Sequence, residues 1–240
     1  MTIYESRLER REEIAEGTIA FHFEKPAGFT FKPGQAIDVI LVDIPSADAQ
    51  SARHTFSIVT APYQGEVVVA TRMRDSAYKR AIKSLPIGSP VRLEGPSGSL
   101  TLHSDHTRPA VFIAGGIGIT PFMSILRQAT NDQLGQRILL LYSNRRPEDA
   151  AFLGELQLLE SRNKDFRLVA TMTQMSESHR AWGGETALVD ENLARRAAGD
   201  LSAPIYYVAG PPGMVDAMRQ TLNRIGVGDD DMRSEEFYGY

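Results

Sequence analysis

Residues 109–126 constrain the fold more than any other stretch of the chain. Their sequence, PAVFIAGGIGITPFMSIL, predicts a buried strand over 110–114, a glycine turn, and a helix that begins at Thr120 and Pro121. Threonine is a good N-cap and proline suits the first helical position. The turn contains three glycines, Gly115, Gly116 and Gly118. Because glycine leaves no side chain between backbone and ligand, and a helix N-terminus attracts anions, we expect a pyrophosphate here. A tight strand-to-helix turn without a ligand is the alternative.

Composition sets broad limits on function. A chain of 240 residues, 42% of them hydrophobic, suits one large or two modest soluble domains. A net charge of −4 gives no bulk attraction to nucleic acid, and the lack of cysteine excludes disulfides and cysteine-held metal or iron–sulfur centres within the chain. The five histidines show no metal-binding spacing. With a charged start and no apolar run near eighteen residues, we expect a cytoplasmic protein without membrane insertion.

The first part of the chain, residues 1–105, has the pattern of an antiparallel domain. Short runs of β-branched and aromatic residues alternate with turns, which is typical of a barrel or a sandwich. The expected strands cover 18–23, 36–42, 54–59, 66–73 and 88–94, with one helix near 76–84.

Residues 106–240 have a different rhythm, in which strands and helices alternate. The expected strands cover 110–114, 137–142, 166–171 and 205–209, and the expected helices 120–129, 148–161, 190–197 and 213–225. This order predicts a doubly wound parallel sheet. Ligands bind such sheets at the carboxyl ends of the strands, where the glycine turn, residues 143–146 and Gly210-Pro211-Pro212 fall.

The strand that contains Arg53-His54-Thr55-Phe56-Ser57 is a candidate ring-binding element. Since neighbouring strand residues point to opposite faces, His54 and Phe56 should share one face and the other three residues the opposite one. Phe56 or its neighbours could present a flat apolar surface to a ring system, with a hydroxyl and a cation nearby. A half-buried strand with an incidental aromatic residue is the alternative.

A cluster of cations follows the next strand. Arg72, Arg74 and the backbone of the helix start at Ser76–Lys79 form a candidate phosphate site, because a helix N-terminus flanked by arginines attracts anions. Arg80 and Lys83, one turn further on, are expected to be solvated surface charges.

The order of these motifs resembles the ferredoxin–NADP⁺ reductase superfamily of flavoenzymes. The chain carries an R-x-[YF]-S-like strand, a G-P-S-G turn, G-G-I-G-I-T-P-F, Y-S-N-R, G-P-P-G-M and a terminal E-E-F, spread over nearly its whole length. The resemblance implies an N-terminal Greek-key barrel that binds FAD (1–105) and a C-terminal domain that binds NAD(P) (106–240). It also implies that the nicotinamide meets the flavin between the two domains.

The resemblance assigns roles to single residues. Phe56 would pack against the isoalloxazine, Ser57 would lie near flavin N5, and Thr120 near the nicotinamide. Glu235 and Phe237 would lie at the other face of the flavin, which makes Ser57, Thr120 and Glu235 the expected catalytic residues. The expected cofactor-binding residues are Arg53, His54, Thr55, Phe56, Ser57, Thr71, Arg72, Arg74, Ser76, Ala77, Tyr78, Lys79, Gly115, Gly116, Gly118, Thr120, Asn144, Arg145, Gly210, Pro211, Pro212 and Phe237.

Three departures from the family pattern bear on these roles. His54 stands where relatives usually have arginine, so Arg72 or Arg74 would carry more of the FAD pyrophosphate. Ser76-Ala77-Tyr78-Lys79 replaces the usual G-x-x-S, which leaves backbone N–H groups and Lys79 to bind phosphate. Ala209 replaces a cysteine, and Tyr238-Gly239-Tyr240 follows Phe237, so the C-terminal cover of the flavin would differ.

The implied reaction is hydride transfer from NAD(P)H to FAD, followed by single-electron release to a separate carrier such as a ferredoxin or a flavodoxin-like protein. A separate oxygenase or iron–sulfur subunit is the other candidate acceptor, since a stand-alone module without cysteine holds no such centre. The choice of nucleotide stays open: Arg145 and Arg146 favour NADPH, whereas Glu148, Asp149 and the sequence at 171–173 favour NADH. Two other functions also stay open, namely a flavin reductase that uses free flavin as substrate and an electron-relay subunit that holds FAD inside a larger complex.

Overall fold

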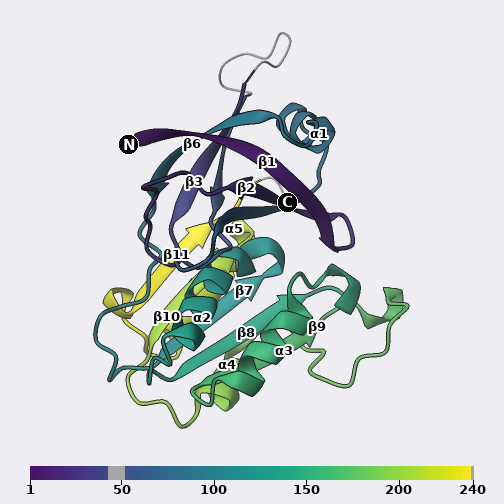
Figure 1. Cartoon of the computed structure of the whole chain (residues 1–240). Helices are drawn as coiled ribbons and strands as arrows, with labels where there is room; N and C mark the ends of the chain where they lie inside the picture. The colour runs from purple at the N-terminus through teal and green to yellow at the C-terminus, as the bar shows by residue number, and fades with distance from the viewer. Residues whose placement is uncertain (43–51, 239–240) are drawn as a thin grey trace. The chain divides into compact units, whose positions relative to one another are not determined.

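The computed structural model describes residues 1–42 and 52–238 and shows two compact units. The first unit contains residues 1–101 and 120–128, and the second contains 102–119 and 129–240. Figure 1 shows the chain in rainbow order, with the first unit in purple and blue apart from the teal residues 120–128. The expected boundary between residues 105 and 106 stays a prediction.

The first unit is built on a six-stranded antiparallel sheet (Figure 1). The strands are β1 (Thr2–Ala15), β2 (Thr18–Glu24), β3 (Ala36–Leu41), β4 (Arg53–Ser57), β5 (Glu66–Arg72) and β6 (Pro90–Ser97). Their order is β4-β3-β6-β1-β2-β5, and an antiparallel bridge between Ile58 and Val69 joins the two outermost strands. The sheet therefore closes on itself, which confirms the predicted antiparallel barrel.

Alternation of apolar side chains explains the barrel core. Phe21 and Phe23 on β2 lie two residues apart and are fully buried, as are Val67 and Val69 on the neighbouring β5. The sequence analysis missed β1, although this 14-residue strand lies inside the sheet between β6 and β2. Half of the β1 side chains are charged and few are fully buried, so its pairing partners, rather than its own apolar pattern, make it a strand.

Helix α1 (Ala77–Ser84), between β5 and β6, begins as the sequence predicts. The Ser76 hydroxyl accepts a hydrogen bond from the Lys79 N–H at 3.2 Å and caps the helix N-terminus. Tyr78 and Ile82, four residues apart, are buried on one side of the helix, and the Tyr78 hydroxyl donates to the Val39 carbonyl at 3.0 Å. This bond fixes the helix start on strand β3.

The second unit contains a five-stranded parallel sheet in the order β11-β10-β7-β8-β9 (Figure 1). Its strands are β7 (Ala110–Gly115), β8 (Ile138–Asn144), β9 (Phe166–Met172), β10 (Ile205–Gly210) and β11 (Met232–Glu236). Its helices are α3 (Leu153–Arg162), α4 (Glu191–Ala198) and α5 (Pro212–Arg224), with short 3-10 turns η1 (Gly116–Ile119), η2 (Pro147–Asp149), η3 (Met175–Glu177) and η4 (Asp229–Asp231). The predicted parallel sheet is confirmed, and β11 was not foreseen.

Alternate residues of the strands make one face of this sheet apolar. Val111 and Ile113 on β7 and Leu139 and Leu141 on β8 belong to one buried cluster. Helices α4 and α5 add Leu193, Ala197, Val215, Met218 and Leu222 to the same cluster. Burial of these side chains stabilises the sheet. Because its five strands run parallel, their carboxyl ends lie at the same edge of the sheet.

One predicted helix start is confirmed and one is wrong. Helix α2 (Thr120–Asn131) begins at Thr120 as predicted, but it follows η1 without a break, so Thr120 is its first residue rather than its N-cap. The helix predicted from residue 148 begins later. Glu148 and Asp149 belong to η2, and Phe152 has φ of 60°, a left-handed conformation that separates η2 from α3.

Candidate functional site

In the first unit, the β4 side chains alternate as predicted, but the accessible ring is not the expected one. The His54 ring stacks on the Phe56 ring, with centroids 4.5 Å apart and an interplanar angle of 16°, and Tyr78 lies beside both. Phe56 is only 7% exposed and belongs to the barrel core, whereas His54 is half-buried. His54 therefore presents the ring surface on this face of β4.

The opposite face of β4 holds a closed ion-pair network. Arg53 donates from Nε to Asp38 at 2.7 Å and from Nη1 to Glu94 at 2.8 Å, while the Thr55 hydroxyl donates to the other Asp38 oxygen. Hydrogen bonds to Asp38 and Glu94 raise the pKa of Arg53. Arg53 is thus held by carboxylates on β3 and β6, which leaves the phosphate role to other cations.

Cations gather instead around the start of α1. The Lys79 side chain is buried and its ammonium donates to the Arg72 carbonyl at 2.8 Å, at the end of β5. Burial, and then the charge of Arg74, lower the pKa of Lys79. Burial also lowers the pKa of His54, and the nearby charge of Lys79 lowers it further. We call His54, Arg74 and Lys79 the α1 cation cluster: the charges of Arg74 and Lys79 oppose each other and would be stabilised by an anion, while the lowered pKa keeps the adjacent His54 ring mostly neutral at pH 7.

Thr71 and Tyr78, two further predicted binding residues near α1, donate their hydroxyl hydrogen bonds to backbone carbonyls of the barrel. Thr71 is buried and its hydroxyl donates to the Arg72 carbonyl at 3.3 Å, while Ala77 is exposed. Burial strongly raises the pKa of Tyr78, so its hydroxyl stays neutral and donates to Val39.

Ser57 ends β4 with an unsatisfied hydroxyl. Its side chain is 4% exposed, and Oγ has no hydrogen-bond partner among the residues that the structure describes. Buried hydroxyls are almost always hydrogen-bonded, so this atom suits a ligand polar group.

Thr120 belongs to the same unit as Ser57. The Ser124 hydroxyl donates to the Thr60 carbonyl at 2.7 Å, and Arg127 donates to the Val59 carbonyl at 3.0 Å. These bonds tie the first turns of α2 to the segment that directly follows Ser57. The predicted pair of catalytic hydroxyls therefore lies within one compact unit, and Thr120 itself is buried.

In the second unit, the glycine turn is shaped by close packing. A Cβ atom on Gly118 would lie 2.2 Å from the Ala209 carbonyl oxygen, and one on Gly115 would lie 2.1 Å from Met214 Sδ. Gly116 has φ of 51°, in the left-handed region that favours glycine. Packing of the turn against β10 and α5 is therefore sufficient to require glycine at these positions, with or without a ligand.

The segment after β10 meets the end of the chain. The Pro211 carbonyl accepts hydrogen bonds from the first turn of α5, which starts at Pro212, and the Gly210 carbonyl accepts one from the Phe237 N–H at 2.9 Å. Glu235 lies on β11 opposite Ala209, and burial raises the pKa of its carboxyl. Within residues 1–42 and 52–238, that carboxyl has no hydrogen-bond or ion-pair partner. Gly239 and Tyr240 lie outside the described residues.

The carboxyl end of β8 carries a further unsatisfied polar group, the side-chain amide of Asn144. Asn144 is 6% exposed, and neither its Nδ2 nor its Oδ1 has a hydrogen-bond partner in the described chain. Its carbonyl is used, because it accepts from the Thr173 N–H at 3.0 Å at the end of β9. Arg145, the next residue, is exposed. A ligand bound at this strand end could satisfy the Asn144 amide.

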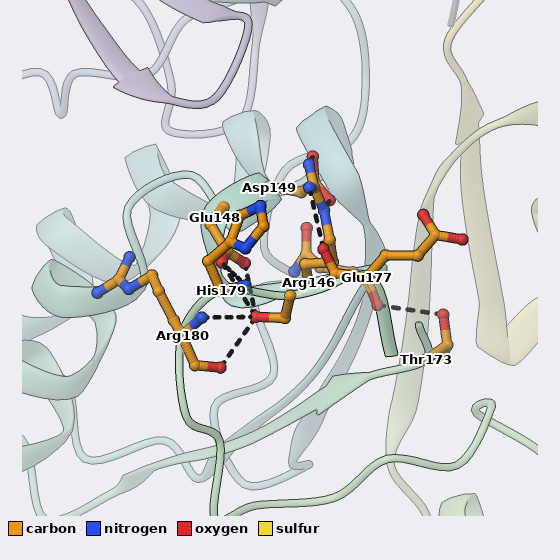
Figure 2. Close-up of polar contacts among 9 residues, drawn as sticks. Arg146, Glu148, Asp149, Thr173, Glu177, His179 and Arg180 are labelled. Atoms are coloured by element: carbon orange, nitrogen blue, oxygen red, sulfur yellow. Dashed lines mark hydrogen bonds and ion pairs between the residues drawn. The ribbon is translucent and has the colours of Figure 1, made fainter. Parts of the chain in front are cut away.

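The polar contacts of the residues after β8 were not predicted from the sequence. Arg146 forms a two-pronged ion pair with Asp149, and Glu148 accepts hydrogen bonds from Ser178 and His179 in the segment after β9 (Figure 2). The three-residue spacing of Arg146 and Asp149 was the only sequence signal for the pair. The partners of Glu148 lie about thirty residues away along the chain and gave no signal.

Among the described residues, no helix is long and apolar enough to cross a membrane. No group of three or more histidine or acidic side chains in residues 1–42 and 52–238 is arranged to hold a metal ion.

Comparisons with known proteins agree with this architecture. Residues 112–220 match the oxidoreductase NAD-binding domain family. The chain is 27% identical over 237 residues to the reductase component of propane 2-monooxygenase from Rhodococcus jostii, covering 97% of this chain and 63% of that protein. It is 26% identical to ferredoxin–NADP reductase B from Sorangium cellulosum, covering 90% of each chain.

The fold also matches solved structures. The structure of a ferredoxin–NADP⁺ reductase from Neisseria gonorrhoeae, with bound FAD and NADP, superposes with a TM-score of 0.81 at 20% identity, covering 98% of this chain and 99% of that one. The chain spans less than two thirds of the length of the propane 2-monooxygenase reductase components that it matches. The chain thus matches an oxidoreductase NAD-binding domain over residues 112–220, is similar to reductases along nearly its whole length, and shares the fold of a ferredoxin–NADP⁺ reductase.

Proposed function

We propose that the chain is an FAD-dependent NAD(P)H oxidoreductase that passes electrons from NAD(P)H through FAD to a separate protein. When bound, FAD supplies the step from two-electron hydride chemistry to single-electron release, so the protein has to bind, orient and exclude water. The observation that carries this proposal is the buried, unsatisfied Ser57 hydroxyl at the end of a strand that also bears His54 of the α1 cation cluster.

The residues of the first unit fit FAD. The flavin ring edge offers nitrogen and oxygen atoms that the Ser57 hydroxyl can bind, and the diphosphate is an anion that Arg74 and Lys79 can bind beside the start of α1. His54 would lie against the bound group with its ring. Thr120 would orient the nicotinamide from the first turn of α2.

The residues of the second unit fit a dinucleotide. The carboxyl ends of β7, β8 and β10 lie at one edge of the parallel sheet, where nucleotides bind in folds of this type. The Asn144 amide, with a free donor and a free acceptor among the described residues, can bind the polar groups of a ribose or a base. Glu235, whose pKa is raised by burial, would hold a proton more readily than an ordinary carboxyl.

The relatives suggest the electron acceptor. Reductase components of two kinds of monooxygenase and a ferredoxin–NADP reductase are similar to this chain over about 90% or more of its length. We therefore propose an oxygenase component, or a small carrier such as ferredoxin or a flavodoxin-like protein, as the partner.

The test begins with the protein purified without added cofactor. Visible flavin absorption that bleaches when NADH or NADPH is added without oxygen would support the proposal. A colourless protein that oxidises NAD(P)H only with added free flavin would indicate the flavin reductase, and bound flavin that neither nucleotide reduces would indicate the relay subunit.

Two lysines of α1 give a matched pair of variants. Lys79→Gln should weaken FAD binding about tenfold, because it removes a buried cation beside the predicted diphosphate. Lys83→Gln, on the same helix but exposed, should leave FAD binding unchanged. Equal FAD affinity in both variants, measured by fluorescence titration of the apoprotein, would contradict the placement of the diphosphate.

A further inference from the structure

We propose that Asp149 gives this enzyme a preference for NADH over NADPH by holding Arg146 in a closed ion pair at the carboxyl end of β8. This inference rests on the proposed function and names which of the two nucleotides the site takes. Its basis is the set of contacts between the segment after β8 and the segment after β9.

The location is where a dinucleotide-binding sheet discriminates between the two nucleotides. In such sheets, an acidic residue after the second strand favours the ribose hydroxyls of NADH, and an arginine there accommodates the extra phosphate of NADPH. Strand β8 follows the strand of the glycine turn in sequence and pairs with it in space. Residues 145–149 follow β8 directly, and Figure 2 shows them beside the segment from Thr173 to Arg180.

Arg146 is already occupied. Its Nε lies 2.9 Å from one Asp149 oxygen and its Nη2 lies 3.1 Å from the other, while Nη1 lies 3.5 Å from the Glu177 carbonyl. The Asp149 side chain is 2% exposed and that of Arg146 is 18% exposed. If Arg146 turned toward a phosphate, it would break its ion pair with a buried carboxylate, which is strongly unfavourable. The arginine is therefore withheld from an NADPH phosphate.

Glu148 adds a second fixed negative charge. The His179 N–H donates to its carboxylate at 2.8 Å, and the Ser178 hydroxyl lies 3.0 Å from both carboxylate oxygens (Figure 2). Although burial acts to raise the pKa of Glu148, these hydrogen bonds and the charge of Arg146 lower it overall. The carboxylate is therefore ionised at neutral pH and repels the phosphate that distinguishes NADPH.

In the described segments after β8 and β9, the side chains of Arg145 and Arg180 are the arginines that form no ion pair. Arg145 is exposed, and its side chain forms no hydrogen bond or ion pair with the described part of the chain. It can approach a phosphate from solvent, where screening makes the interaction weak. We therefore expect residual use of NADPH rather than none.

The test measures kcat/KM for NADH and NADPH with the FAD-loaded protein. We expect the unaltered protein to favour NADH by about tenfold or more. Asp149→Asn keeps the shape of the side chain but removes its charge, so it should raise kcat/KM for NADPH about tenfold, through KM, with little change for NADH.

Two further variants separate a specificity role from a structural one. Adding Arg146→Gln to Asp149→Asn should abolish the gain with NADPH, because the freed arginine is its source. Asp200→Asn breaks another aspartate–arginine pair, with Arg137 at the amino end of β8. This variant should change kcat/KM for neither NADH nor NADPH. A preference of the unaltered protein for NADPH, or an unchanged ratio in Asp149→Asn, would overturn the inference.

A measurement on the unaltered protein keeps the test decisive if Asp149→Asn does not fold. The inhibitors 5′-AMP and 2′,5′-ADP differ by the phosphate in question, and we expect the second to compete with NADH no better than the first. Tenfold stronger inhibition by 2′,5′-ADP would refute the inference. Failure to oxidise either nucleotide would refute the proposed function instead, so the two failures are distinguishable.

Discussion

Replacement of Gly118 by alanine tests whether the glycine turn is shaped by packing or by its ligand. An ideal Cβ at this position would lie 2.2 Å from the Ala209 carbonyl oxygen, 2.5 Å from the Ala209 carbonyl carbon and 2.8 Å from Gly210 Cα. All three atoms are backbone atoms of β10. That strand is held on both sides, by β7 and by β11, so it cannot move away without breaking ladder hydrogen bonds.

The size of the effect follows from this geometry. The closest contact is about 1.2 Å shorter than the 3.4 Å at which ordinary contact begins. Overpacking of a tight interior costs about 1–3 kcal/mol, and a clash with fixed backbone belongs at the upper end or above. With a shift of about 2–4 °C for each kcal/mol in a protein of this size, Gly118→Ala should lower Tm by about 6–12 °C.

Two other glycines calibrate the measurement. Gly115→Ala should cost less, about 1 kcal/mol, because its nearest atom is the sulfur of the flexible Met214 side chain. Gly154→Ala meets nothing within 4 Å and lies inside α3, so it should raise stability by about 0.5–1 kcal/mol.

The assay is thermal unfolding followed by the fluorescence of Trp182, the single tryptophan, which lies in the second unit with the glycine turn. Its indole donates to the Glu185 carbonyl at 2.8 Å, so unfolding of this unit should change its emission. If Gly118→Ala unfolds at the same temperature as the unaltered protein and loses only nucleotide binding, the packing argument is refuted and the glycine serves the ligand alone.

Three further predictions concern single side chains. Ser57→Ala should change the free energy of unfolding by no more than about 0.5 kcal/mol, because Oγ has no partner in the described residues. The variant should nevertheless slow flavin reduction in a stopped-flow assay, and a full rate with full FAD content would contradict the role of Ser57. Tyr207→Phe should cost about 1–3 kcal/mol in urea unfolding, since the Tyr207 hydroxyl accepts from the His103 N–H at 2.9 Å and bonds His103 Nδ1 at 2.8 Å; a smaller loss would mean that water replaces it. Burial lowers the pKa values of His54 and His103 below the ordinary 6.5, so the unfolded chain binds more protons than the folded chain. The free energy of unfolding should therefore fall as pH drops below about 6.5. A flat pH profile of the unaltered protein between pH 7 and 5 would refute this, and the same experiment on a His103→Asn variant isolates the contribution of His103.

The structure changes the interpretation of two arginines, one predicted to bind the cofactor and one weighed as a sign of NADPH. Arg53 was expected to contact the cofactor, but Asp38 and Glu94 hold it on the outer face of β4. Arg146 was weighed as a sign of NADPH, but Asp149 holds it. In both cases a cation that appears available in the sequence is neutralised by a carboxylate in the fold.

The class of each unit could be derived from local pattern. Runs of alternating apolar residues predicted the antiparallel barrel, the alternation of strands and helices after residue 106 predicted the parallel sheet, and the start of α1 near Ser76 was predicted as well. These features depend on residues close together in the chain, where periodicity and capping chemistry act. Strands β1 and β11 escaped because partner strands, rather than their own apolar residues, hold them in place.

The state of the site residues depends on contacts between distant segments. Three features show this: the unsatisfied hydroxyl of Ser57, the close approach of Gly118 to Ala209, and the hydrogen bond from the His179 N–H to Glu148. Each depends on which distant segments folding brings together. Residue type and spacing determine which chemistry the chain can offer. Whether a given charge or hydroxyl stays available for a ligand is determined by the strand or loop that folding places beside it, because a buried polar group takes a partner from the protein whenever one is within reach.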